Sequence, residues 1–198
     1  TPSTTTEPTE NLIGANSETS CRRTAQDDKP ACFIIDGDKA EMNGVIGENI
    51  ISKVSELINS YPLVSTIVLN DVPGSEDDES NLEAAKMVFN AGFNTELTAQ
   101  SRIASGGVDF FLAGVSRTIE DGAELGVHSW GAEDEQGKLI QGKDFPQDHP
   151  SHQPYIDFYN EIQHPNGKEF YFYTLAAAPA DDIHIMSKDE LLQWKMAR

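Results

Sequence analysis

Ser105 is the residue whose surroundings best suit nucleophilic chemistry. It follows a strand-like segment, stands before Gly106 and Gly107, and opens an apolar helix-like stretch. On such a glycine-flanked turn the serine hydroxyl would be exposed, and the N–H groups of the two glycines would be free to bind an anion. Serine is also a favoured first residue of helices, so the same pattern fits a purely structural cap.

Two further features could complete a site around a nucleophile. Gly74 follows Pro73 in a turn directly after an apolar run, and the carboxyl ends of parallel strands are where α/β proteins bind ligands. His128 ends an alternating segment, on the face opposite its apolar residues, and a neutral imidazole can take a proton from a serine hydroxyl. A Pro-Gly pair is also typical of an ordinary type II turn, and a lone histidine is often a surface or core residue.

The segments that would position these residues alternate between two patterns. Apolar runs at residues 32–36, 66–70 and 93–97 are typical of buried strands, and apolar residues recur at helical spacing over 50–58 and 82–89. Alternating strands and helices predict an α/β fold with a parallel sheet and helices packed on it.

The second half of the chain continues with more helices. Residues 131–154 are polar and charged, which predicts a long surface loop, and helices are expected over 155–162 and 168–178. A last helix should begin after Ser187, because Ser187 and Glu190 have the spacing of a capping box.

The N-terminal 30 residues differ from the rest in composition. They are rich in Thr, Ser, Pro and Glu, so we expect a flexible tether over 1–30, or a frayed terminus with a cloning remnant, and one folded domain over 31–198. Cys21 and Cys32 are close enough in sequence to close a small loop as a disulfide, which would favour an exported protein in an oxidising compartment, periplasmic or extracellular. Two unrelated free cysteines are the alternative.

The charge of the chain restricts its partners. A formal net charge of −19 argues against nucleic acid and anionic lipid, and no apolar run is long enough to span a bilayer. The acidic run at 76–79 reads as a solvated face that would bias a nearby site towards cationic substrates. The His- and Asp-containing loop at 148–152 lacks zinc-site spacing, so we expect no metal. The aromatic residues of 155–173 are expected in the core or at a subunit interface, rather than as a substrate platform.

The order of these features resembles the Clp protease proteolytic subunit and the wider crotonase-like superfamily. In Clp-type proteins a serine opens a helix that ends in Ala-Gly, as Ser105 leads here to Ala113 and Gly114, and a histidine follows at the distance of His128. The segment at 72–75 is similar to the family's Ser-Pro-Gly-Gly oxyanion loop, with Ser75 in place of the second glycine. Uncharacterised exported Clp-like serine hydrolases show similar Ala-Gly-x-x-Arg and Gly-x-His-Ser segments.

This resemblance implies a spiral of β-β-α units with a mainly parallel sheet flanked by helices. It implies an exported, peptidase-like serine hydrolase that needs no cofactor and acts on a peptide or acyl substrate. Ser105 would be the nucleophile, His128 the base, and the N–H groups of an oxyanion hole would come from the residues Gly74, Ser75 and Gly106. The orienting acid would be Asp182 or Asp181, although both miss the family's position by a residue or two.

Three interpretations of this resemblance remain open. Apart from an active hydrolase, the chain could be a catalytically inactive binding or assembly module, which the departures at Ser75 and at the acid position would explain. An acyl-CoA-binding crotonase enzyme is a third interpretation, but the serine–histidine pair and the negative charge argue against it. A homo-oligomer and a lipid-anchored stalk upstream are both compatible with the sequence.

Overall fold

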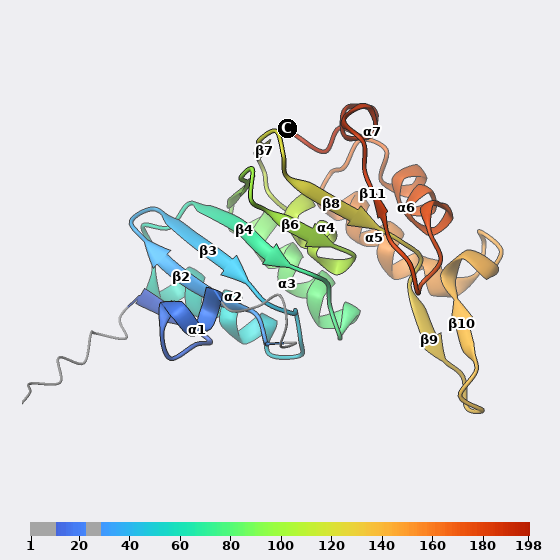
Figure 1. The fold of residues 1–198 in the computed structure, drawn as a ribbon, viewed down its shortest axis with the longest axis horizontal. Coiled ribbons are helices and arrows are strands. Elements are labelled where there is room, and N and C mark those ends of the chain that lie inside the picture. The colour runs from blue at the N-terminus through green and yellow to red at the C-terminus, as the bar shows by residue number, and fades with distance from the viewer. Residues whose placement is uncertain (1–10, 23–28) are drawn as a thin grey trace, which may run out of the picture.

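The computed structural model describes residues 11–22 and 29–198, and its centre is a sheet of parallel strands (Figure 1). Four strands lie side by side in this order, each parallel to the next: β3 (Lys39–Asn43), β4 (Thr66–Val72), β6 (Arg102–Ala104) and β8 (Glu124–Val127). The predicted α/β fold with a mainly parallel sheet flanked by helices is confirmed.

The sheet branches at β4. Its first residues pair with β5 (Asn94–Leu97), whereas its last residues pair with β6, and β5 continues to β7 (Arg117–Ile119). Antiparallel strands extend the main sheet on both sides, with β2 (Cys32–Asp36) next to β3 and β11 (His184–Ile185) next to β8. The central strands are therefore covered at both edges, and their carboxyl ends meet at one place.

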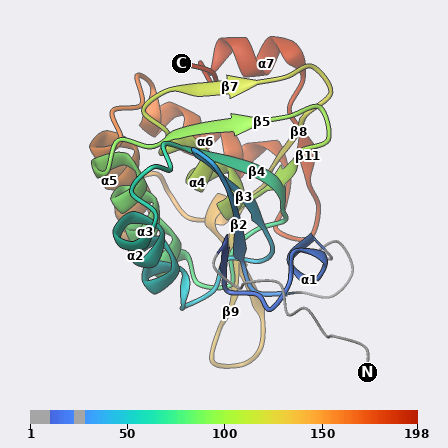
Figure 2. The same cartoon turned by 90° about the vertical axis from the view of Figure 1, so that its left-hand side faces the viewer.

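Helices pack against one face of the sheet, as the apolar periodicity predicts. They are α2 (Ile50–Ser60), α3 (Asp78–Asn90), α4 (Gly106–Leu112), α5 (Gln153–Glu161) and α6 (Gly167–Ala177). Figure 2 shows α2, α3 and α5 together on one side of β2 and β3. The last helix, α7 (Lys188–Gln193), begins with the predicted capping box. Within residues 11–22 and 29–198, no helix is long and apolar enough to cross a membrane.

Several short elements were not expected from the sequence. The stretch at 131–154, predicted as a surface loop, contains an antiparallel hairpin of β9 (Gly131–Glu133) and β10 (Leu139–Gln141) and two 3₁₀ turns, Gly142–Asp144 and Pro150–His152. All three residues of β9 are exposed, so the hairpin lacks the apolar alternation by which strands are found in a sequence.

Residues 11–22 are folded, contrary to the tether expected over 1–30. β1 (Leu12–Ile13) pairs with β2, and the side chain of Ile13 is buried in the core. The helix α1 (Glu18–Arg22) is joined to β2 by the Cys21–Cys32 disulfide, which confirms the predicted pairing. The pairing of β1 with β2 and the disulfide therefore hold a segment whose composition is otherwise polar. Residues 1–10 and 23–28 lie outside the described residues.

Candidate active site

Three neighbouring strands end at the residues that the sequence singles out. Gly74 follows β4, Ser105 follows β6 and His128 follows β8, and the three strands are adjacent in the order β4, β6, β8. Since parallel neighbours end at the same edge of a sheet, the fold itself brings these residues to one place. A Cβ atom built on Gly74 would lie 3.5 Å from Cβ of Ser105, so the first two are in direct contact.

Ser105 has a backbone conformation that residues with a side chain rarely adopt. Its φ is 52° and its ψ is −123°, at the junction between β6 and α4. Such a conformation costs about 1–3 kcal/mol and persists only where the surroundings enforce it. Here the Ser105 N–H donates to the carbonyl of Gly126 in β8 (2.9 Å), and the N–H of Val108 donates to the Ser105 carbonyl (2.9 Å). A sharp strand-to-helix turn of this kind exposes the nucleophilic serine of α/β-hydrolases.

The glycines around Ser105 let α4 begin directly against the end of β4. A Cβ atom at Gly107 would lie 2.5 Å from the carbonyl oxygen of Val72, so no larger residue fits there without moving the backbone. The N–H groups of Gly74 and Gly106 have no hydrogen-bond partner within the described part of the chain. Each of these two glycines therefore has a main-chain N–H group beside Ser105 that can donate to a ligand.

Ser75 supports this loop through its side chain. The Ser75 hydroxyl donates a hydrogen bond to the carboxylate of Asp78, and it would be in close contact with a Cβ atom on residue 106. The amide of Asn81 lies near the same point and donates to the Gly106 carbonyl (2.9 Å). Ser75 thus ties the loop at 72–75 to the start of α3.

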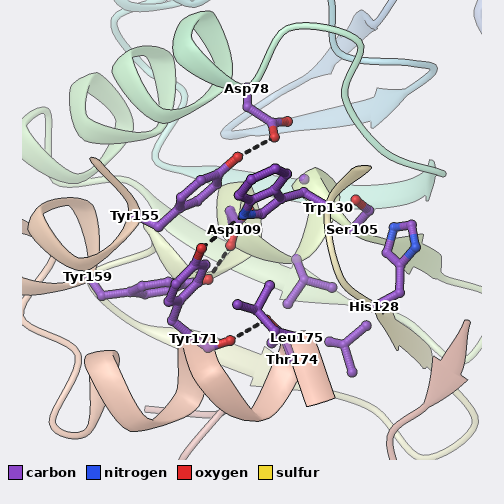
Figure 3. A pocket seen from close by; sticks show the side chains of 13 residues that line it. Asp78, Ser105, Asp109, His128, Trp130, Tyr155, Tyr159, Tyr171, Thr174 and Leu175 are labelled. Atoms are coloured by element: carbon purple, nitrogen blue, oxygen red, sulfur yellow. Dashed lines mark hydrogen bonds between the residues drawn. The ribbon is translucent and has the colours of Figure 1, made fainter. Parts of the chain in front are cut away.

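His128 is oriented by a main-chain group. Its Nδ1 atom lies 3.1 Å from the carbonyl oxygen of Ala180, which can only accept, so Nδ1 carries the proton and Nε2 is free to accept one. The Ala180 N–H in turn donates to Oε1 of Gln141 (2.7 Å), which anchors the peptide. No hydrogen bond joins the described side chains of Ser105 and His128, but both line the same cavity (Figure 3).

The structure does not place the predicted acid at His128. Asp181 and Asp182 are both exposed, and neither forms an ion pair with His128. The Asp182 carboxylate accepts a hydrogen bond from the Ile183 N–H (2.8 Å), and its own N–H donates to the carbonyl of Pro179 (3.1 Å). This tight turn directs both aspartates to solvent and presents the carbonyl of Ala180 to the imidazole instead.

The cavity beside Ser105 has a volume of about 40 Å³ and two unlike sides. We call one the strand-end side; it consists of Ser105, Gly106, Val127 and His128. We call the other the helix side; it consists of Asp78, Asp109, Tyr155, Tyr159 and Tyr171, which come from α3, α4, α5 and α6. The remaining lining residues are Val108, Trp130, Thr174 and Leu175.

Hydrogen bonds organise the helix side (Figure 3). The Tyr155 hydroxyl donates to the Asp78 carboxylate (2.5 Å), and the Tyr159 hydroxyl donates to the Asp109 carboxylate. Trp130 donates from Nε1 to the hydroxyl of Tyr171 (2.9 Å). Sequence reasoning expected these aromatic residues in the core or at an interface and missed their part in the cavity. One signal was available for Asp109: it follows Ser105 by four residues, and residues four apart lie on the same face of a helix.

Asp109 is the most perturbed acid of the cavity. Burial raises the pKa of its carboxyl from 3.8 to about 7, although the hydrogen bond from Tyr159 lowers it in part. Among the described residues, neither Asp109 nor Asp78 has a Lys, Arg or His partner, and no group of three or more His, Cys, Asp and Glu is placed to hold a metal ion. Near neutral pH the cavity therefore contains carboxyl groups without a counter-cation.

Among known proteins, only solved structures are similar to this chain. No protein-family model and no curated protein matches the sequence. A mutant of the membrane-bound stomatin-specific protease 1510-N matches with a TM-score of 0.55 and 12% identity, over 80% of this chain and 75% of that chain. A second mutant of it, in complex with a substrate peptide, matches with a TM-score of 0.50 and 12% identity, over 81% and 71%.

An enoyl-CoA hydratase is similar as well. The enzyme from Mycobacterium avium subsp. paratuberculosis K-10 has a TM-score of 0.50 and 10% identity, over 84% of this chain and 69% of that chain. At such identities the likeness concerns the fold. The chain therefore has the Clp/crotonase-like fold that the order of its sequence motifs predicts.

Proposed function

We propose that this chain is a serine hydrolase of peptidase type, with Ser105 as nucleophile and His128 as general base. The observation that carries the proposal is the strained backbone of Ser105, at φ 52° and ψ −123°, beside the N–H groups of Gly74 and Gly106 that lack partners among the described residues. Strain of this kind is retained at functional sites, where it aims a side chain at a substrate. The shared fold of a protease supports the same function.

The geometry suggests how each group would act. Nε2 of His128 would accept the proton of the Ser105 hydroxyl as its oxygen bonds to the acyl carbon. The negative charge on the former carbonyl oxygen would be stabilised by the N–H groups of Gly74 and Gly106, with the N–H of Ser75 next in the loop. The imidazolium would then protonate the leaving group, and water would release the acyl group by the reverse path. Ala180 would take the orienting role predicted for Asp182 or Asp181.

The location of the protein belongs to the same proposal. We propose export to the periplasm or the cell exterior, because the structure contains the Cys21–Cys32 disulfide. Disulfides persist in oxidising compartments and are rare in the cytosol. A peptidase outside the cytoplasm would meet its substrate without the chain having to enter a reducing environment.

A fluorophosphonate probe tests the proposed nucleophile. We expect it to label the wild type and the Ser116→Ala control, and to spare Ser105→Ala. Ser116 is exposed, does not line the cavity and donates its hydroxyl to the carbonyl of Arg198. His128→Ala should label at least about 100-fold more slowly, because a positioned general base contributes 10²–10⁴ in rate. Labelling of Ser105→Ala at the wild-type rate would contradict the proposal.

An inactive binding module of the same fold is the second candidate. Two observations favour it: no hydrogen bond joins Ser105 to His128, and Asp181 and Asp182 face solvent. A folded wild-type protein that no serine-directed probe labels would decide for this candidate. Circular dichroism on the same sample would establish that the protein is folded.

A further inference from the structure

We propose, on the basis of the proposed function, that the cavity is the subsite for the side chain on the acyl side of the cleaved bond. We further propose that Asp109 makes this subsite select an unbranched cationic side chain, such as that of lysine. Ser105 and Asp109 line the same cavity, so a group attached to the attacked carbonyl can enter it.

The spacing along α4 suits a chain of that length. Asp109 is four residues after Ser105, which corresponds to about 6 Å along a helix at a rise of 1.5 Å per residue. An extended lysine side chain spans a similar distance from its Cα atom to its ammonium group. A substrate whose carbonyl lies at Ser105 would therefore place the ammonium group beside the Asp109 carboxylate.

The unmatched charge of the helix side indicates the sign of the ligand. Oδ1 of Asp109 accepts from Tyr159, whereas Oδ2 has no hydrogen-bond partner within the described part of the chain. Both oxygens of Asp78 are already occupied, by Ser75 and Tyr155. Asp109 is half-buried, and its Oδ2 is not among the fully buried atoms, so a ligand in the cavity can reach it. A cationic ligand would pair with this carboxylate, whereas an anionic one would meet two acids.

The shape of the cavity restricts the ligand further. At about 40 Å³ the cavity is small, so the group that enters it must be small or thin. Its walls include stacked aromatic rings: Tyr155 and Tyr171 have centroids 5.0 Å apart and planes at 12°. Aromatic faces attract cations and also pack well against methylene groups. The hydroxyls of Tyr155 and Tyr159 donate to carboxylates, so they offer no protons to an anion.

Two diphenyl phosphonate probes test the selectivity. One bears a 4-aminobutyl side chain and the other its neutral isostere, a pentyl side chain. We expect wild type to react about tenfold or more faster with the aminobutyl probe, as one hydrogen bond to a charged group provides. In Asp109→Asn, which keeps the shape and an acceptor for Tyr159, the two rates should become equal. Asp157→Asn, an exposed acid of α5, should behave as wild type. A wild-type preference for the pentyl probe, or an unchanged ratio in Asp109→Asn, would overturn the subsite.

A binding measurement separates this inference from the proposed function. Calorimetry should show that n-butylammonium chloride binds to the Ser105→Ala variant and that 1-butanol does not. The double variant Ser105→Ala, Asp109→Asn should bind neither. At pH 7 binding should release protons, because the bound cation favours the charged form of Asp109, whose pKa is about 7. Binding without any labelling of Ser105 would refute the hydrolase and keep the cation site, whereas labelling without binding or selectivity would refute the cation site alone.

Discussion

The two sides of the cavity are built from different parts of the chain. On the strand-end side, main-chain groups surround the side chains of Ser105 and His128. They are the N–H groups of Gly74 and Gly106 and the carbonyl of Ala180, of which Gly74 and Ala180 lie next to this side. The helix side works through side chains that can lose or gain a proton, above all Asp109. The first side suits catalysis, because it holds the proposed nucleophile and base, and the second suits the choice of substrate. Substitutions should therefore separate reactivity from selectivity and from stability.

The largest effect is expected from Asp109→Asn above neutral pH. The folded-state pKa of about 7 is above the ordinary 3.8, so between these values the folded protein holds more protons than the unfolded chain, and its stability falls as pH rises. Three pKa units correspond to at most about 4 kcal/mol. We expect Asp109→Asn to exceed wild type in free energy of unfolding by about 1–4 kcal/mol at pH 8, and the difference to vanish near pH 4.

Urea unfolding at pH 4, 6 and 8 would measure this difference, with Asp157→Asn as the charge-matched control. A variant that is less stable than wild type at pH 8 would show that Asp109 is paired in the folded protein. The helix side would then lack the unpaired carboxylate on which its proposed selectivity depends.

Gly107→Ala should have the next largest effect, and it acts at the start of α4, next to the strand-end side. The added methyl group would lie 2.5 Å from the Val72 carbonyl oxygen, so the start of α4 must move away from β4. We expect a loss of about 1–3 kcal/mol in the free energy of unfolding, together with slower labelling of Ser105. Gly47→Ala, where an added Cβ atom meets nothing within 4 Å, is the matched control. Wild-type stability and labelling rate in Gly107→Ala would refute the tight packing.

Tyr155→Phe should have the smallest effect and should leave reactivity intact. It removes the hydrogen bond to Asp78 and leaves one carboxylate oxygen without its donor, which costs about 1 kcal/mol. Fluorophosphonate labelling should stay within about twofold of wild type, because Tyr155 touches neither the nucleophile nor its oxyanion donors. A larger loss of labelling in Tyr155→Phe than in Gly107→Ala would show that reactivity depends more on the helix side than on the strand-end side.

The strand-end side could be predicted from the sequence because its signals are local. Pro73-Gly74 and Ser105-Gly106 are short patterns, and their meeting follows from the rule that parallel strands end at one edge of the sheet. The Ala180 carbonyl could not be predicted, because any residue type presents a carbonyl and only the turn at 179–182 decides which one faces His128.

The helix side could be predicted only in part. Its residues come from four helices, and the same aromatic pattern serves a plain core, so their meeting depends on packing that has no local signal. The acidic run at 76–79 suggested cationic substrates, and of its residues Asp78 lines the cavity. Glu76 and Glu79 of the same run are exposed. The folded part of the N-terminal segment was missed for a related reason: β1 is two residues long and depends on β2 and on a disulfide.

The position of the phosphonate adduct tests the central claim most directly. Wild-type protein treated with a fluorophosphonate would be weighed intact and then digested, and the modified peptide would be sequenced by tandem mass spectrometry. We expect one adduct per chain, on Ser105, and none when the protein is unfolded before treatment. An adduct on a tyrosine or on another serine, or equal labelling of folded and unfolded protein, would show that Ser105 is not an activated nucleophile.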